Sequence, residues 1–186
     1  MKDFLEVENV VRKRLSEKRF NHSKSVEENC EKLAKKYGEN IEKARLVGIA
    51  HDMAKEISTD EKMIYCGKNN IEIDPVEKKN PELLHGKIGA DIAKKEFEFD
   101  DSMCRAIEYH TTGKVGMDLL AKILFVADCI ADDRTWDGIE EGRKKAYEDL
   151  DAAVLYFLNH TIAHMIEKNL CIHPDSIFLR NEYLDK

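Results

Sequence analysis

The sequence predicts an all-α protein folded as a single helical bundle. Only three prolines interrupt the 186 residues, and apolar residues recur mainly three and four positions apart, which is the period of amphipathic helices. With 42% apolar residues, a chain of this length can bury roughly 70% of the surface that its unfolded form exposes. We therefore expect one domain, with a core over about residues 19–134 and a C-terminal helical extension over 135–186.

Three helices are expected at the N-terminus. The first spans residues 4–15, and the second carries an apolar stripe over 22–37 and ends at Gly38, because glycine favours the left-handed conformation that closes a helix. The short connection between them predicts a helical hairpin. The third helix, residues 41–54, is apolar almost all round, as expected of a helix surrounded by others.

The remaining elements follow from the same period and from turn residues. The stretch that holds Pro75, Asn80 and Pro81 is expected to be a loop that leads into His85. The polar tail after the last helix is expected to fray. The other expected helices are residues 60–68, 86–97, 101–110 and 118–131, a polar helix after Gly138, and a long helix over 150–170.

Charge and composition argue against several classes of protein. A net charge of −7 does not suit a protein that holds nucleic acid through a basic surface. The longest apolar run, residues 123–127, is far shorter than the ~18 residues of a membrane span, and the acidic start does not resemble a secretory signal. Five cysteines without a Cys-x-x-Cys motif suit a reducing cytoplasm. We expect a cytoplasmic protein without nucleic-acid or membrane partners, and a homodimer is compatible with the sequence.

Four histidines lie on the apolar stripes of their helices and should point inward: His22, His51, His85 and His110. A single inward histidine is usually a core residue bonded to a carbonyl or to water. Four of them, from four separate segments, favour a shared ligand.

Two aspartates strengthen this interpretation. Asp52 and Asp128 each follow an apolar run, and an unpaired carboxylate there would cost several kcal/mol. Lys55 and Arg134 could each pair with one aspartate, but this would leave the four imidazoles unexplained, whereas one or two metal ions would explain all six residues. Because neighbours on a helix project about 100° apart, His51 and Asp52 could approach one ion while Asp52 also reaches a second.

The order of these residues resembles the H…HD…D signature of HD-domain phosphohydrolases, and His85 and His110 resemble the extra pair of members that hold two metals. Five strings narrow the resemblance to symmetrical diadenosine tetraphosphate hydrolases of the YqeK type. One departure is the segment 131–136, where relatives tend to carry Glu-Pro before the arginine. The five strings are Arg19-Phe20-Asn21-His22-Ser23, His51-Asp52-Met53-Ala54-Lys55, Leu84-His85-Gly86-Lys87-Ile88-Gly89-Ala90, His110-Thr111-Thr112-Gly113 and Phe125-Val126-Ala127-Asp128.

The resemblance implies a reaction and a set of metal ligands. The expected reaction is hydrolysis of diadenosine tetraphosphate to two ADP by a hydroxide bound between two metal ions. Imidazole and carboxylate ligands accept iron, manganese, zinc, nickel or cobalt, and the family favours iron. One ion would take His22, His51, Asp52 and Asp128, and the second would take Asp52, His85 and His110.

Cations near these motifs are candidates for phosphate binding. Lys55 stands one turn after Asp52 and is the first candidate, although it could instead pair with Asp52 or Glu56. Arg134 is the second, because an arginine can bind phosphate through two donors. Two threonines could donate hydroxyl hydrogen bonds to phosphate, or could cap a helix at the Gly113 turn. The expected substrate-binding residues are thus Lys55, Thr111, Thr112 and Arg134, and the expected catalytic residues are Asp52, Lys55 and Arg134.

Other interpretations remain open. The metal site could serve another nucleotide, such as a nucleoside phosphate or a cyclic or alarmone nucleotide. A helical sensor with a structural metal, or an interaction module without metal, would also suit the helical pattern. His160 and His164 lie one turn apart and could bind a metal, but packing explains them more simply. Tyr109 and Trp136 could stack on a base, and core packing explains them equally well.

Overall fold

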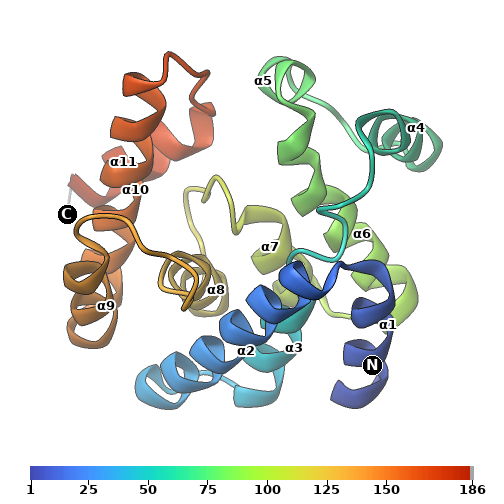
Figure 1. Cartoon of the computed structure of the whole chain (residues 1–186), viewed down its shortest axis with the longest axis horizontal. Coiled ribbons are helices and arrows are strands. Elements are labelled where there is room, and N and C mark those ends of the chain that lie inside the picture. The colour runs from blue at the N-terminus through green and yellow to red at the C-terminus, as the bar shows by residue number, and fades with distance from the viewer. Residues whose placement is uncertain (185–186) are drawn as a thin grey trace.

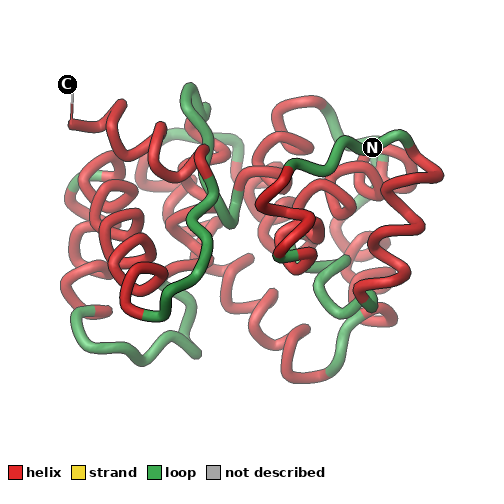
Figure 2. Tube along the Cα trace, turned by 90° about the horizontal axis from the view of Figure 1, so that it is seen from above, coloured by secondary structure: helices red, strands yellow, loops and turns green. Residues whose placement is uncertain are grey.

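The computed structural model describes residues 1–184, and this range contains eleven α-helices, one 3-10 helix and no strand (Figures 1 and 2). The all-α prediction is confirmed. The last two residues of the expected extension lie outside the described range. No helix within residues 1–184 has the length and apolar character to cross a bilayer. In chain order the elements are α1 (Phe4–Arg14), α2 (Glu17–Tyr37), α3 (Ile41–Ala50), α4 (Thr59–Asn69), α5 (Pro75–Lys79), η1 (Pro81–Leu83), α6 (Leu84–Phe97), α7 (Asp101–Tyr109), α8 (Leu119–Cys129), α9 (Ile139–Glu148), α10 (Leu150–Glu167) and α11 (Pro174–Leu184).

Helices α2 and α3 pack against each other most extensively, and α8 packs against both (Figure 1). Gly48 of α3 permits the approach, because a Cβ at this position would lie 2.8 Å from the Cα of Glu27 in α2. The N-terminal helix α1 packs chiefly on α3 and only slightly on α2, so the predicted α1–α2 hairpin is wrong. The apolar stripe of α2, which includes Val26 and Leu33, is buried and leaves little apolar surface for α1.

Replacing Gly48 with alanine is expected to lower the free energy of unfolding by roughly 1–3 kcal/mol, the usual cost of overpacking a core. Backbone atoms of α2 stand where the new methyl group would go, so relief requires the two helices to separate. Chemical denaturation measures the change. Gly67→Ala in α4 is the matched control: nothing lies within 4 Å of its added Cβ, so it should leave stability unchanged or raise it by about 0.5–1 kcal/mol. Equal stability losses in both variants would contradict the close-approach argument.

Helix α3 ends at Ala50 rather than at the predicted residue 54, and residues 51–57 form successive turns. The imidazole of His51 donates from Nδ1 to the carbonyl oxygen of Gly48, at 2.8 Å. Within an α-helix this carbonyl would accept from the amide of residue 52. The side chain therefore occupies an acceptor of the helix at the point where the functional pair His51–Asp52 begins.

The segment predicted as a loop before His85 is also more regular than expected. Asp74 caps α5 through a reciprocal capping box with Glu77, and Pro75 and Pro81 stand in the first turns of α5 and η1, where proline loses no hydrogen bond. His85 consequently lies in the first turn of α6, not at the end of a free loop. The two prolines that indicated a break instead start two short helices.

The C-terminal tail, expected to fray, forms α11 through residue 184. Leu179 is buried and packs against the turn at Gly113. The hydroxyl of Ser176 donates to the carbonyl of Thr112 at 2.7 Å. Gly113 has a φ of +66°, and a Cβ there would lie 2.3 Å from a Leu179 methyl group. The tail is therefore fixed to the turn that follows α7, beside the functional site described next.

Candidate metal centre

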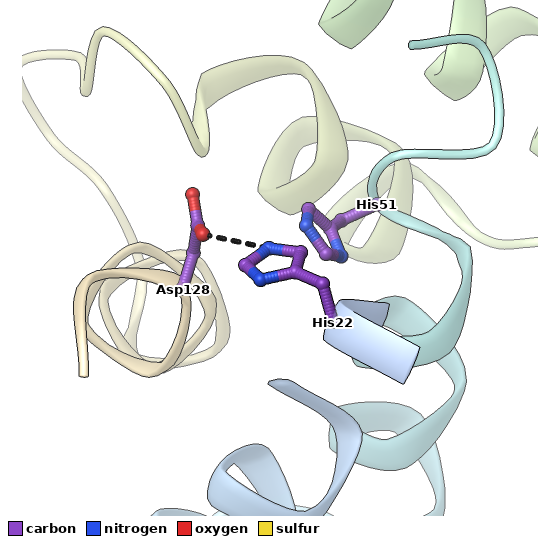
Figure 3. Close-up of side chains that lie close together, drawn as sticks. All are labelled: His22, His51 and Asp128. Carbon is purple, nitrogen blue, oxygen red and sulfur yellow. Dashed lines mark ion pairs between the residues drawn. The ribbon is translucent and has the colours of Figure 1, made fainter. Parts of the chain in front are cut away.

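The four predicted histidines converge between α2, α3, α6, α7 and α8. Neighbouring ring centroids are 5.5 Å apart for His22 and His51, 5.0 Å for His51 and His110, and 4.9 Å for His85 and His110. All four side chains are buried. Figure 3 shows one side of this cluster, where His22 of α2 and His51 at the end of α3 face Asp128 of α8.

Three of the imidazoles are anchored in the same way. In each, Nδ1 donates to the carbonyl oxygen three residues earlier in the chain. Since a carbonyl oxygen only accepts, the three rings carry their proton on Nδ1, which leaves the Nε2 lone pair directed at the cluster. The pairs are His51 with Gly48 at 2.8 Å, His85 with Glu82 at 2.5 Å and His110 with Ile107 at 2.7 Å.

The fourth imidazole is oriented by a carboxylate. Nδ1 of His22 lies 2.8 Å from Oδ1 of Asp133, and this second partner again leaves Nε2 facing the cluster. Carboxylates commonly orient metal-binding histidines in this way. A role for Asp133 was not predicted from the sequence, although the surrounding segment 131–136 departs from the family pattern.

Removing the Asp133 carboxylate is expected to weaken metal binding by roughly 10- to 100-fold, as for other groups that orient a metal ligand. Asp133→Ala removes the acceptor, whereas Asp133→Asn keeps a side-chain oxygen at this place and should retain most of the affinity. Competition with a chromophoric chelator measures the affinity of each variant. Equal affinity of the alanine variant and the unmodified protein would show that His22 needs no orienting partner.

Asp52 lies at the centre of the cluster, with one carboxylate oxygen on each side. Oδ2 lies 3.4 Å from Nε2 of His51 and 3.9 Å from Nε2 of His22, whereas Oδ1 lies 3.2 Å from Nε2 of His85. On the same side as His85, Nε2 of His110 lies 3.7 Å from Oδ1. The two carboxylate oxygens of Asp52 therefore face the two histidine pairs.

Two arginines accompany the two aspartates of the cluster. Nη1 of Arg19 donates to Oδ2 of Asp52 at 3.0 Å, and Nη2 of Arg134 donates to Oδ1 of Asp128 at 2.5 Å. Oδ1 of Asp128 also lies 3.1 Å from Nε2 of His22. Burial raises the pKa of Asp128, but the Arg134 guanidinium beside it outweighs this effect, brings the pKa below its ordinary value and keeps the carboxylate charged. Arg19 belongs to the first of the five family strings, but its bond to Asp52 was not predicted from the sequence.

The donor set fits metal ions. Nε2 of His51 is buried and has no hydrogen-bond partner within the described residues 1–184, and the buried Nε2 of His22 faces Asp128 without forming a hydrogen bond of regular geometry. Nε2 of His85 and Nε2 of His110 are 3.0 Å apart, yet the Nδ1 protons leave lone pairs on both atoms, an arrangement that a cation between them would stabilise. Bonds of about 2.0–2.1 Å to a shared ion place two ligand atoms about 3.0–3.4 Å apart, which is the separation observed for several of these pairs.

The expected phosphate-binding residues lie around this centre. Lys55 is partly buried, and within residues 1–184 its ammonium forms no ion pair: Asp52 bonds to Arg19, and Glu56 bonds to Ser16. The alternative of a Lys55 ion pair with either acid is therefore wrong. Burial lowers the pKa of the Lys55 ammonium, against the attraction of Asp52.

The two expected threonines differ in their contacts. The Thr111 hydroxyl lies 3.1 Å from Nε2 of His110 and 3.3 Å from Nε2 of His85, at the edge of the cluster. The Thr112 hydroxyl instead donates to the Gly113 carbonyl at 3.1 Å. The structure therefore brings Thr111 to the centre and places the Thr112 hydroxyl in the turn.

Two cavities meet the cluster at Thr111. One, of about 870 Å³, is lined by α5, α6, α7 and the start of α11, and its lysines Lys87 and Lys114 already pair with Glu77 and Asp175. The other, of about 250 Å³, is lined by His110, Asp128 and Arg134 at one end and by residues of α10 at the other. His160 and His164 line this smaller cavity and do not join the metal cluster.

A further group with the composition of a metal site lies in the larger cavity, formed by Asp74, Glu77 and His173. Its atoms are used internally: Nε2 of His173 lies 2.7 Å from Asp74, and Glu77 accepts from Lys87 at 2.7 Å. These bonds explain the arrangement without an ion.

Comparison with known families agrees with this geometry. The family model for the HD domain matches residues 19–133, a range that contains all six clustered histidines and aspartates. The chain belongs to the HD-domain family. The sequence-based recognition of this HD domain is confirmed.

Relatives of this HD-domain protein resemble it over nearly its whole length. It is 36% identical to a symmetrical bis(5'-nucleosyl)-tetraphosphatase of Halalkalibacterium halodurans, with 94% of each chain aligned. It is 33% identical to an enzyme of the same name from Bacillus subtilis, with 92% of each chain aligned. A crystal structure of a predicted HD superfamily hydrolase involved in NAD metabolism, from Clostridium acetobutylicum, superposes with a TM-score of 0.95 at 36% identity, covering 100% of this chain and 98% of that one.

Proposed function

We propose that this HD-domain protein hydrolyses diadenosine tetraphosphate into two molecules of ADP. The relatives named symmetrical bis(5'-nucleosyl)-tetraphosphatases align over more than nine tenths of the chain. The observation that carries the proposal is the central carboxylate of Asp52, whose two oxygens face two separate pairs of imidazoles. Such a carboxylate suits a pair of ions that act on a phosphoanhydride, and a scaffolding metal would not require it.

The proposed ligands follow the two sides of Asp52. On one side they are His22, His51, Asp52 and Asp128, and on the other Asp52, His85 and His110. Two bound ions would supply an activated water at neutral pH and would withdraw charge from the phosphoryl oxygens. Nitrogen and carboxylate ligands suit iron, manganese, zinc, nickel or cobalt, and we favour iron from the resemblance to the family.

Four of the chain's own residues have further tasks in this reaction. The unpaired Lys55 ammonium binds phosphate oxygens, since it is the cation beside Asp52 that forms no ion pair within residues 1–184. Arg134 holds Asp128 through Nη2 and offers its other nitrogen atoms to the same phosphates. Thr111 donates its hydroxyl to a phosphate oxygen at the edge of the cluster. The Asp52 carboxylate, which accepts from Arg19, would bind both ions between the two pairs of imidazoles.

The reaction consumes one water. Its oxygen bonds to a phosphorus beside the central bridging oxygen, and the bond between that phosphorus and the bridging oxygen breaks. The bridging oxygen leaves as part of the second ADP, while Lys55 and Arg134 stabilise the charge that develops on the departing phosphate. Cleavage at this position gives two identical products.

Product analysis tests the proposal. The protein, purified and supplied with iron or manganese, should convert diadenosine tetraphosphate to ADP alone, and in ¹⁸O-labelled water each cleavage should place one labelled oxygen on one ADP. Formation of ATP and AMP would contradict symmetrical cleavage. Binding of the dinucleotide without product would instead favour the sensor interpretation.

A substrate panel tests the runner-up. Nucleoside phosphates, cyclic nucleotides and alarmones should be cleaved more slowly than diadenosine tetraphosphate, and NAD belongs in the panel because the Clostridium acetobutylicum protein is described as involved in NAD metabolism. A higher kcat/KM for any of them would move the assignment to that substrate. The homodimer and the cytoplasmic location stay predictions from the sequence.

A further inference from the structure

The smaller cavity beside the metal centre has two chemically different ends. Its inner end is formed by Asp128, Arg134 and His110 of the candidate centre. Its outer end is formed by Trp136, which follows α8, and by residues of α10 that include Phe157 and His160. One end is therefore charged and the other is aromatic, a division that matches a phosphate joined to a nucleoside.

The aromatic end contains a stacked pair of flat rings. The imidazole of His160 lies on the indole of Trp136 with ring centroids 3.6 Å apart and an angle of 16° between the planes, and the ring of Phe157 meets the indole edge-on. Trp136 and His160 are only partly buried. The pair thus presents stacked aromatic surface to a cavity, where most paired aromatics of a core would be fully enclosed.

Polar groups that could form hydrogen bonds with a base lie beside the Trp136–His160 pair. The hydroxyl of Thr161 and the imidazole of His164 line the same cavity and form no side-chain hydrogen bond within the described residues. Both are on the α10 side, away from Asp128 and Arg134. A purine that packed against the rings would present its polar edge to these groups.

We propose that the cavity is the subsite for one nucleobase of the substrate, with a purine packed against the Trp136–His160 pair and its 5'-phosphates directed to Arg134 and the metal centre. The inference rests on the proposed function for the identity of the substrate. A volume of about 250 Å³ is below the ~300–1,000 Å³ of sites for drug-sized ligands, so it suits a single nucleoside. The other half of a dinucleotide must lie outside it.

Trp136 is the only tryptophan in the chain, so its fluorescence reports on this cavity directly. Titration of the metal-loaded protein with ADP should change the emission of Trp136, and inorganic tripolyphosphate at the same ionic strength should not. A response to ADP that tripolyphosphate reproduces fully would overturn the proposal, because it would assign the change to the phosphates. The absence of any response to ADP at concentrations that inhibit the enzyme would also overturn it.

Trp136→Leu provides an independent measurement. Base stacking on aromatic side chains predicts a roughly 5- to 150-fold increase in KM for diadenosine tetraphosphate, with kcat and metal content nearly unchanged. Trp136→Phe keeps an aromatic ring and should restore most of the loss. Tyr147→Leu is the matched control, since this tyrosine is exposed on α9 and lines neither cavity. If Trp136→Leu lowered the thermal stability and left KM unchanged, the Trp136–His160 pair would serve only to pack the protein and the proposal would be wrong.

The two hypotheses fail in different ways. If the protein cleaves diadenosine tetraphosphate to ADP and Trp136 neither responds to ADP nor affects KM, the subsite is wrong and the proposed function stands. If it does not cleave the dinucleotide but Trp136 responds to ADP and not to tripolyphosphate, the subsite stands and the function must be reassigned to another nucleotide.

Discussion

Replacing Asp52 with alanine is expected to abolish turnover and to release metal in the same variant. The two carboxylate oxygens face the two halves of the imidazole cluster, so the change removes a ligand from both proposed ion positions at once. We expect a loss of at least about 1,000-fold in kcat/KM, which corresponds to about 4 kcal/mol of transition-state stabilisation. Elemental analysis of the freshly purified variant should find well below two ions per chain.

Two controls make this result specific. Circular dichroism should show that the Asp52→Ala variant keeps its helices, since the small side chain fits in place of the larger one. Asp132→Ala replaces an exposed aspartate of the segment that follows α8 and should retain both metal and activity. An Asp52→Ala variant that kept two ions and measurable turnover would contradict the bridging role.

Replacing His110 with alanine is expected to reduce the metal content from two ions per chain to one. Nε2 of His110 lies beside Nε2 of His85 and Oδ1 of Asp52, on the side opposite His22 and Asp128. The ion held by the other side should therefore remain. We expect turnover to fall by roughly 100-fold or more. The lost ion would otherwise stabilise the charge that develops in the transition state by several kcal/mol.

His85→Ala should reproduce the His110→Ala result, because both imidazoles belong to the same side of the cluster. His173→Ala is the matched control: this histidine bonds to Asp74 and lies in the larger cavity, so two ions per chain should remain. If either cluster variant retained two ions, or lost both, the division into two ion positions would be wrong.

The sequence predicted the helices and the six clustered residues because both depend on local spacing. A period of three to four apolar residues identifies a helix, and the same period shows that His22, His51, His85 and His110 lie on the buried faces. Where ionisable groups share such faces, a partner is physically required. The convergence of the six side chains therefore followed from the pattern, together with the order of the family motifs.

Helix ends and tertiary contacts could be predicted less well from the sequence. At the end of α3, His51 bonds to the Gly48 carbonyl, a local contact that apolar periodicity does not register. Helix α11 is stabilised where Leu179 meets the Gly113 turn, a contact between segments far apart in the sequence. The polar composition of the tail gave no sign of it.

The roles of Arg19 and Asp133 were missed for a related reason. Both are charged and partly exposed, and such residues usually face solvent without a specific task. Their importance comes from position, since Arg19 bonds to Asp52 and Asp133 to His22 across the interior. The acidic segment before Arg134 was the available signal for Asp133, since it differed from the family pattern at this place.

The order in which the ligands occur along the chain bears on how the protein is made. During translation the N-terminal part of a chain leaves the ribosome first, so His22, His51, Asp52 and His85 emerge well before Asp128 of α8. A nascent chain that stops short of α8 lacks one carboxylate and the helix that packs against both α2 and α3. Metal insertion should therefore be a late event, completed only after most of the polypeptide has been synthesised.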